Sequence, residues 1–421
     1  MEKYLEIISN GLYSYRKGKL FIEDVDVEKL VSRFGTPLYV YSCSLIQNQI
    51  KKIRDSFKNV SPLICYSMKA NSNLKILKLV HKSGCGVDIV SGGELARALK
   101  AGFKGNSIVF AGVGKTANEI VEAIKANIYF FTVESIEELK TIDKIAGNLK
   151  SKVNCCLRIN LDVDVDTHHY TKTAKKETKF GLSPQQVSSV IRHQRDFKHL
   201  KLAGIQFHLG SNIKISSPYI EALKRLKTFL DDTGFKPQII DIGGGFGIPY
   251  RIENIEPIEV FGERISDFFV KNFPSVSMVI EPGRFIVGNA GVLLTRIIYK
   301  KKTEAKKFLI VDAGMNDLIR PALYNSYHEI IPAVVYKGMN ETYDIVGPIC
   351  ETGDFLGKER SLSANLDAGD VLAVMSAGAY GFSMSSNYNG RPRPAEIMVS
   401  GKKVIVCRKR ENISDLWKHE M

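Results

Sequence analysis

The most constraining feature of the sequence is a regular alternation of strand-like and helix-like segments between residues 62 and 281. Short apolar, β-prone runs alternate with segments whose apolar residues recur at helical spacing, several of which open on Ser, Asn or Thr caps. Strand candidates lie near 62–69, 86–90, 107–111, 129–134, 153–160, 201–208, 238–243 and 276–281, and helix candidates between them near 72–83, 92–101, 116–127, 135–147, 183–195, 217–232 and 257–272. Eight parallel strands with helical crossovers predict an α/β fold, a closed (β/α)8 TIM-like barrel, with a doubly wound open sheet as the alternative.

The chain is too long for one ordinary core, since it has 421 residues. From residue 286 onward, apolar strand-like runs separated by Gly, Asn, Asp and Lys turns predominate. This pattern of short strand-like runs and turns predicts a second, β-rich domain of sandwich or barrel type. We expect an N-terminal segment (1–35) that joins the β domain, the barrel (36–285) and the C-terminal β domain (286–421).

Charge and cysteine content narrow the class of protein. The 59 Lys+Arg against 45 Asp+Glu give a net charge of +14, but the basic residues are scattered, so no nucleic-acid partner is expected and anionic metabolites are favoured. Seven cysteines without a CxxC pair predict reduced thiols and a cytoplasmic location. No signal-like start and no apolar run of roughly 20 residues is present, so no membrane partner is expected. No metal site is expected either.

Polar residues gather at the carboxyl ends of the strand candidates, where barrels of this type carry their active sites. Lys69 ends the first strand, Asp88 lies in the second, Arg158 ends the fifth, His208 the sixth and Glu281 the eighth. A lysine in such a crevice can have a lowered pKa and form a Schiff base. A solvated loop lysine and a satisfied core histidine are the alternatives for single members of this set.

Three consecutive glycines, Gly243–Gly245, leave backbone amides unshielded, which suits the approach of a phosphate. A tight strand-to-helix turn is the alternative. The motif is not the dinucleotide GxGxxG, because Ile248 stands where the third glycine is required. The segment Gly112–Thr116 is not a P-loop either, because Val109 stands where that motif begins.

Glycine-bounded loops in the second domain collect further polar and aromatic groups. The loop Gly347–Asp354 places Cys350 beside Glu351. Similar loops lie at 312–317, 320–324, 377–381 and 387–391. Such loops commonly carry binding residues, although a spare buried cysteine is the usual reading of a lone thiol.

Taken in order, these motifs resemble the fold-type III pyridoxal-phosphate-dependent decarboxylases, and among them the enzymes that act on diaminopimelate. The resemblance is nearly full length and is carried by residues 66–71, 90–95, 112–116, 179–181, 208–211, 281–284, 320–324 and 377–381. It implies a barrel that binds pyridoxal 5′-phosphate, a β domain, and a homodimer whose active sites are shared between subunits.

The resemblance also implies roles on the cofactor side. Lys69 is similar to the lysine that binds the cofactor covalently, Glu281 to the carboxylate that faces the pyridine nitrogen, and His208 to the imidazole stacked on the ring. The implied phosphate contacts are Ser211, Gly244, Gly245, Gly283 and Arg284, and the implied supports near the ring are Asp88 and Arg158.

On the substrate side, Arg284, Arg320 and Tyr324 match positions that bind a distal carboxylate. Glu351 matches the partner of the distal amine, Tyr380 a residue that touches cofactor and substrate, and Cys350 the acid that reprotonates the α-carbon from the partner subunit. These matches imply conversion of meso-2,6-diaminopimelate to L-lysine and carbon dioxide, the last step of lysine biosynthesis.

Two alternatives remain. A decarboxylase of ornithine, arginine or carboxynorspermidine shares the fold, but Arg320 with Tyr324 argues against the first two, whose distal ends carry no carboxylate. A non-catalytic homologue would be expected to lack Lys69 or Cys350. The sequence departs from the family pattern at Thr352, where serine is usual, and over 170–174.

Overall fold

The computed structural model describes residues 1–164 and 179–421, and its chain divides into two compact units. The first unit comprises Gln49–Gly247 and Ile255–Phe285. The second comprises Met1–Asn48, Ile248–Asn254 and Ile286–Met421. The N-terminal residues therefore belong to the same unit as the C-terminal third of the chain.

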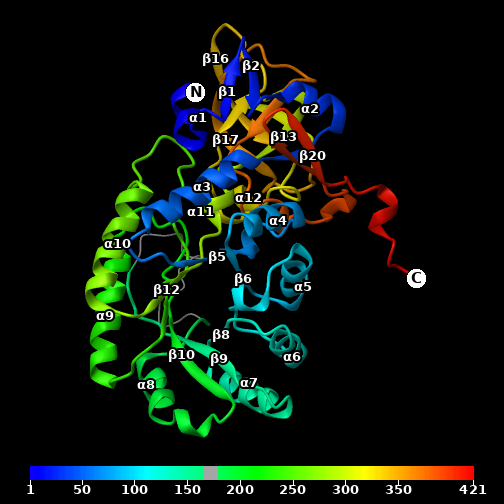
Figure 1. Ribbon diagram of the computed structural model, residues 1–421. Coiled ribbons are helices and arrows are strands. Elements are labelled where there is room, and N and C mark those ends of the chain that lie inside the picture. Colours follow the sequence, from blue (N-terminus) through cyan, green and yellow to red (C-terminus); the bar gives the residue numbers. More distant parts are fainter. Residues whose placement is uncertain (165–178) are drawn as a thin grey trace. The chain divides into compact units, whose positions relative to one another are not determined.

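The first unit contains a closed barrel of parallel strands (Figure 1). Its strands are β5 (Leu63–Ser67), β6 (Gly86–Ile89), β7 (Ile108–Phe110), β8 (Phe130–Val133), β9 (Val153–Arg158), β10 (Leu200–Gln206), β11 (Ile239–Asp241) and β12 (Ser277–Ile280). Neighbours in the sequence are neighbours in the barrel, and β12 pairs with β5 to close it. The (β/α)8 prediction is confirmed, and the open doubly wound sheet is excluded because no edge strand is left in this sheet as described.

Helices lie around these strands (Figure 1). They are α4 (Leu74–Lys82), α5 (Gly92–Ala101), α6 (Ala117–Lys125), α7 (Ile136–Asn148), α8 (Pro184–Arg192), α9 (Ser217–Thr233) and α10 (Ile258–Asn272). Five of them begin after a side-chain cap that accepts a backbone N–H, at Asn73, Ser91, Thr116, Ser135 and Ser183. Over the ranges described, no helix has both the length and the apolar character needed to cross a membrane.

Apolar side chains contributed by the strands of the barrel form a buried cluster. Cys65, Val109, Phe130, Cys156 and Ala203 form one buried cluster with residues of β11 and β12. Cysteine behaves as a small hydrophobe in such a position. Two of the seven thiols are thereby accounted for as packing residues.

The second unit is β-rich, as expected. Its nine-stranded sheet is built from β4 (Leu38–Ser42), β13 (Gly291–Lys302), β14 (Lys307–Val311), β15 (Ile330–Pro332), β16 (Asn340–Val346), β17 (Phe355–Ser363), β18 (Val371–Val374), β19 (Ala395–Ser400) and β20 (Lys403–Arg408). The long strand β13 pairs with β4, β14 and β18 and so joins most of the sheet.

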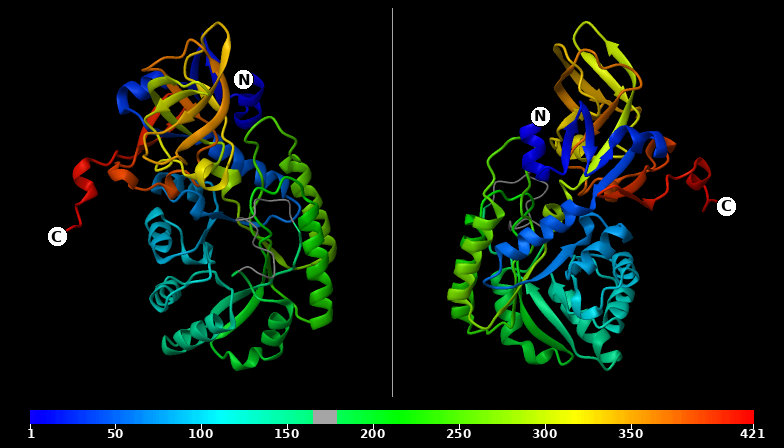
Figure 2. Two further views of the ribbon diagram at one scale, coloured as in Figure 1. Left: turned by 180° about the vertical axis from the view of Figure 1, so that it is seen from behind. Right: turned by 45° about the horizontal axis from the view of Figure 1, so that its top comes forward.

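The N-terminal segment packs on this sheet. It contains α1 (Glu2–Ser9), β1 (Tyr13–Arg16), β2 (Lys19–Ile22), β3 (Val25–Asp26) and α2 (Val27–Phe34). Figure 2 shows its strands, in blue, beside yellow strands of the C-terminal region. The contact includes two backbone hydrogen bonds of 2.8 Å, from Leu20 N to Ala333 O and from Val335 N to Gly18 O.

Two details differ from expectation. The barrel was expected to begin at residue 36, but β4 is hydrogen-bonded to β13 and β19 and belongs to the β sheet, so the compact unit that holds the barrel begins at Gln49. Strands β16 and β17 were not predicted. Their apolar pattern is weak because charged residues such as Lys358 and Glu359 lie exposed within β17.

Candidate active site

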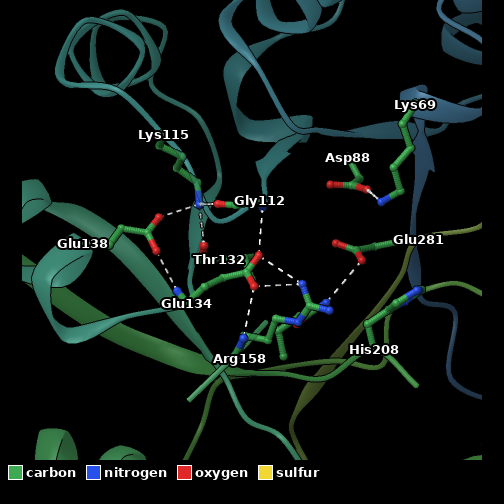
Figure 3. A network of polar contacts seen from close by, with 12 residues as sticks. Lys69, Asp88, Gly112, Lys115, Thr132, Glu134, Glu138, Arg158, His208 and Glu281 are labelled. Carbon is green, nitrogen blue, oxygen red and sulfur yellow. Dashed lines mark hydrogen bonds and ion pairs between the residues drawn. The ribbon is translucent and has the colours of Figure 1, made fainter. Parts of the chain in front are cut away.

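Lys69 lies directly after β5, in a short 3₁₀ turn, η1 (Met68–Ala70). Its Nζ is 3.2 Å from Oδ2 of Asp88, and the hydroxyl of Ser67 donates to the same oxygen at 2.6 Å. The contact follows from strand register, because Ser67 and Asp88 are paired across β5 and β6. Figure 3 shows the amine directed at this carboxylate. The side chain of Lys69 is 41% exposed while that of Asp88 is fully buried, so the amine is open to a reactant and the carboxylate orients it.

Glu281 follows β12 and lies with Asp241, the last residue of β11, in a fully buried carboxyl pair. Oε2 of Glu281 accepts a hydrogen bond from Gln206 at 3.3 Å, and the Glu281 carboxyl also shares a hydrogen bond with Asp241, whereas Oε1 meets no nitrogen or hydroxyl donor among the described residues. Burial raises the pKa of Glu281 well above its ordinary value, and repulsion by Asp241 and Asp88 adds to this. A cation placed at Oε1 would relieve both effects.

His208 is an acceptor at one ring nitrogen. The backbone N–H of Gly244 points to its Nδ1 at 3.3 Å, so a neutral ring carries its proton on Nε2. Burial, with the positive charges of Arg158 and Lys69, holds the pKa of His208 well below its ordinary value. The site therefore contains a neutral imidazole, which can lie flat against an aromatic ring without adding charge.

The three glycines are required by close backbone packing. Gly243 and Gly245 have positive φ values of 69° and 97°, and a Cβ at Gly244 would lie 2.0 Å from the carbonyl oxygen of Glu281. The predicted turn is thus present, and the amide of Gly244 is directed to His208. The amide role of Gly244 toward a phosphate stays a prediction.

A guanidinium and a hydroxyl lie together at the start of α11 (Arg284–Val287). Nη2 of Arg284 donates to Oγ of Ser211 at 2.9 Å. A Cβ added at the preceding Gly283 would lie 3.1 Å from the Cβ of Ser67, so the backbone passes close to Ser67 here. Arginine, hydroxyl and glycine-rich backbone form a donor set suited to a phosphate group.

Arg158, the last residue of β9, is held by a residue that the sequence analysis did not single out. Both oxygens of Glu134 accept from Nη1 of Arg158 at 3.0 Å, and both side chains are buried (Figure 3). The backbone amides of Gly112 and Gly181 also donate to Glu134, at 3.1 and 3.2 Å. Glu134 directly follows β8, so the pattern of a polar residue after an apolar strand could have found it.

Lys115 supports the same corner of the barrel. Its Nζ donates to Glu138 at 2.6 Å and to the carbonyl oxygens of Gly112 and Thr132. The other oxygen of Glu138 accepts the backbone N–H of Glu134 at 2.7 Å. The lysine of the Gly112–Thr116 segment is thus a buried structural cation, which agrees with the rejection of a P-loop.

We expect Glu134→Gln to lower the free energy of unfolding by about 3 to 5 kcal/mol, because it leaves Arg158 buried beside a neutral amide. Urea denaturation of the apoprotein measures this. The control is Glu137→Gln, an exposed position three residues along the chain from Glu134, which should change stability by less than about 0.5 kcal/mol. A loss below about 1 kcal/mol for Glu134→Gln would show that the ion pair is not needed for folding.

The cysteine loop belongs to the second unit and connects β16 to β17. Cys350 and Glu351 are exposed. The backbone N–H of Cys350 donates to Asn389 Oδ1 at 2.9 Å, and Glu351 accepts from the hydroxyl of Tyr388 at 2.8 Å. Buried Asp354 fixes the loop from within by accepting the amide of Ile349 at 2.7 Å.

The remaining predicted residues also lie in the second unit. Arg320, at the start of α12 (Arg320–Tyr324), is buried, whereas Tyr324 is half-buried. Tyr380 is half-buried and has a positive φ of 56°, an uncommon conformation for a residue other than glycine. Such backbone outliers concentrate at functional sites.

The structure thus brings ten of the predicted residues together at one end of the barrel, and it places the other five in loops and a short helix of the second unit. The ten are Lys69, Asp88, Arg158, His208, Ser211, Gly244, Gly245, Glu281, Gly283 and Arg284; the five are Arg320, Tyr324, Cys350, Glu351 and Tyr380. Four further residues contact this cluster but were not among the predicted site residues: Ser67, Glu134, Gln206 and Asp241. The 170–174 departure lies outside the described residues.

The barrel cluster fits pyridoxal phosphate. The accessible amine of Lys69 suits its aldehyde, and Arg284 with Ser211 suits its phosphate. The buried carboxyl of Glu281 lacks a donor at Oε1, which a protonated ring nitrogen would supply. A neutral His208 suits the face of the ring.

Comparison with known proteins also points to a pyridoxal-dependent decarboxylase. Residues 43–288 match the family model for the pyridoxal binding domain of pyridoxal-dependent decarboxylases. A diaminopimelate decarboxylase from Aquifex aeolicus is 45% identical over 408 residues, which cover 96% of each chain. One from Vibrio cholerae is 44% identical over 409 residues, covering 96% of this chain and 97% of that one.

Solved structures agree in fold over nearly the whole chain. Diaminopimelate decarboxylase from Helicobacter pylori, in complex with L-lysine, gives a TM-score of 0.88 at 40% identity and covers 93% of this chain and 98% of its own. The enzyme of that name from M. jannaschii, also with L-lysine, gives 0.92 at 36% identity and covers 98% of both chains.

Proposed function

The chain belongs to the pyridoxal-dependent decarboxylases, and we propose that it converts meso-2,6-diaminopimelate to L-lysine and carbon dioxide with pyridoxal 5′-phosphate as cofactor. The observation that carries the proposal is the Lys69 amine, 3.2 Å from buried Asp88 at the end of a barrel strand. This amine is in the same cluster as Glu281, whose buried Oε1 meets no nitrogen or hydroxyl donor among the described residues.

Bound pyridoxal phosphate would supply a ring that accepts the electrons left on the α-carbon when carbon dioxide departs. Lys69 would bind its aldehyde, with Asp88 orienting that amine. Glu281 would keep a proton on the ring nitrogen, which makes the ring a better electron acceptor. His208 would face the ring, and Arg158 would support the cluster with its positive charge. The residues that would hold the phosphate are Ser211, Gly244, Gly245, Gly283 and Arg284.

Substrate selection is assigned to the second unit and to Arg284. Arg320, Tyr324 and Arg284 bind the distal carboxylate, a task suited to the two-pronged geometry of guanidinium. Glu351 binds the distal amine, and Tyr380 contacts cofactor and substrate. Support comes from the family motif at each position and from the buried, ordered setting of Arg320.

We further propose a cytoplasmic homodimer in which Cys350 of the partner subunit returns a proton to the α-carbon. All seven cysteines are free thiols, which suits a reducing compartment. The proposal is supported by the exposure of the Cys350 thiol, on a loop that Asp354 fixes from within.

Cys350→Ala should reduce kcat by roughly 10²-fold, the scale of losing a proton donor, while leaving cofactor affinity unchanged. Steady-state turnover and cofactor titration of the apoprotein measure the two effects. Cys407→Ala, at a half-buried thiol on β20, is the matched control and should retain wild-type turnover. Full activity of Cys350→Ala would remove this thiol from the reaction.

The proposed function is tested by supplying purified protein and pyridoxal phosphate with meso-diaminopimelate, ornithine and arginine separately. Carbon dioxide release is expected with meso-diaminopimelate, and the product should be L-lysine. Release mainly from ornithine or arginine would instead favour the alternative of a same-fold decarboxylase. If none of the three substrates released carbon dioxide, the result would contradict the proposed function and would not support a decarboxylase of ornithine or arginine either.

A further inference from the structure

Arg320 is held by a buried histidine that no motif in the sequence analysis included. Nε2 of His328 lies 2.9 Å from Nη1 of Arg320, and Nδ1 of the same ring lies 2.9 Å from the carbonyl oxygen of Met375. His328 is completely buried and Arg320 is 5% exposed. All three residues belong to the second compact unit.

These two contacts fix the protonation of the ring. A carbonyl oxygen can only accept, so Nδ1 must carry the hydrogen that points to Met375. A guanidinium can only donate, so Nε2 must carry a lone pair that faces Arg320. Both hydrogen bonds form together only in the neutral tautomer with hydrogen on Nδ1. A charged ring would place an N–H directly against the guanidinium.

Two further contacts set the plane of the guanidinium. Nη2 of Arg320 donates to the hydroxyl of Ser326 at 3.3 Å, and its Cζ lies 5.0 Å from the centre of the Tyr250 ring. Tyr250 also meets the His328 ring edge to face, with centroids 5.3 Å apart. An arginine side chain is normally flexible, so partners on two edges and one face of the guanidinium, of which His328 and Tyr250 are buried, select one orientation.

We propose that His328, in its neutral Nδ1–H tautomer, is the positioning residue that orients Arg320 for the distal carboxylate of the substrate, and so contributes to substrate selection. This inference rests on the proposed function. The carboxylate in question is the one that decarboxylation leaves in place, so L-lysine retains it. Cadaverine, which is lysine without its carboxyl group, lacks it and serves as the matched ligand.

Two variants separate the two hydrogen bonds. In His328→Gln, the side-chain carbonyl can reach the position of Nε2 and accept from Arg320, while the bond to Met375 is lost. In His328→Asn, the amide N–H can replace Nδ1 and donate to Met375, while the acceptor for Arg320 is lost. The variants remove the same ring, so each is the packing control for the other.

Calorimetric titration of the holoenzyme with L-lysine and with cadaverine tests the inference. Wild type should prefer L-lysine. His328→Asn should weaken L-lysine binding roughly tenfold, by analogy with loss of a group that orients a ligating residue, and should leave cadaverine binding unchanged. KM for meso-diaminopimelate should rise in parallel with little change in kcat. His328→Gln should largely restore both.

An unchanged preference for L-lysine in His328→Asn, or equal losses of both ligands in both variants, would overturn the inference while leaving the proposed function in place. A wild-type holoenzyme that neither binds L-lysine nor decarboxylates meso-diaminopimelate would overturn the proposed function and this inference with it. If the variants do not fold, nitrogen NMR of histidine-labelled wild type decides, because a ring protonated on Nε2 or on both nitrogens contradicts the assignment.

Discussion

Replacing Lys69 by alanine should abolish the visible-edge absorption of bound pyridoxal phosphate and reduce decarboxylation on the order of 10⁴-fold. The loss is large because the variant removes a group at the reacting centre rather than a supporting contact. The amine is partly exposed beside a buried carboxylate, so alanine removes little packing, and the fold should survive. Absorption spectra and carbon dioxide release measure the two effects.

The matched control is Lys78→Ala, an exposed lysine in the helix that follows Lys69. It should keep both the absorption band and the activity. A Lys69→Ala protein with an unchanged band would mean that another lysine, or noncovalent binding, accounts for the cofactor.

Glu281→Gln should lower kcat roughly 10² to 10³-fold, because an amide cannot hold a proton on the ring nitrogen by charge, and a fixed electrostatic partner of the reacting system is lost. The substitution is nearly isosteric, and its amide can still accept from Gln206. The effect should therefore appear in kcat and in the cofactor spectrum rather than as misfolding. Exposed Glu263→Gln, on α10, is the control.

The same variant should stabilise the apoprotein at pH 8, by on the order of 1 kcal/mol. Native Glu281 has a raised pKa, while an unfolded glutamate titrates near 4.3. At pH values above the unfolded pKa, the native state holds a proton that the unfolded state has released, so wild-type stability falls as pH rises until the native group also ionises. Glutamine removes this loss. Urea denaturation at pH 5 and pH 8 should show a smaller pH dependence for the variant, and an equal or larger one would contradict the assignment.

The barrel was predictable because its pattern is local. Each strand, such as β8, is a short buried apolar run between capped helices, and eight of them leave few parallel arrangements. Residues at the strand ends could be named for the same reason, because a shared edge brings them together whatever their separation in sequence. The sequence motifs implied roles for these residues through the family resemblance, but they did not predict which residues contact one another.

What could not be predicted depends on register and on distant partners. The sequence shows polar Glu134 and Arg158 at the ends of two strands, but their pairing follows from how β8 and β9 align. The amide of Gly181, which also donates to Glu134, comes from a segment outside both strands. Strand β4 resembles a barrel strand by composition, and only its pairing with β13 and β19 assigns it to the β sheet. The tautomer of His328 likewise depends on Met375, which no local pattern connects to it.

Borohydride reduction of the holoenzyme, followed by peptide mass spectrometry, identifies the lysine that binds the cofactor, because reduction fixes the cofactor to whichever amine bears it. One reduced pyridoxyl adduct per chain is expected, on Lys69. An adduct on another lysine, or none in a protein that still releases carbon dioxide from meso-diaminopimelate, would contradict this assignment.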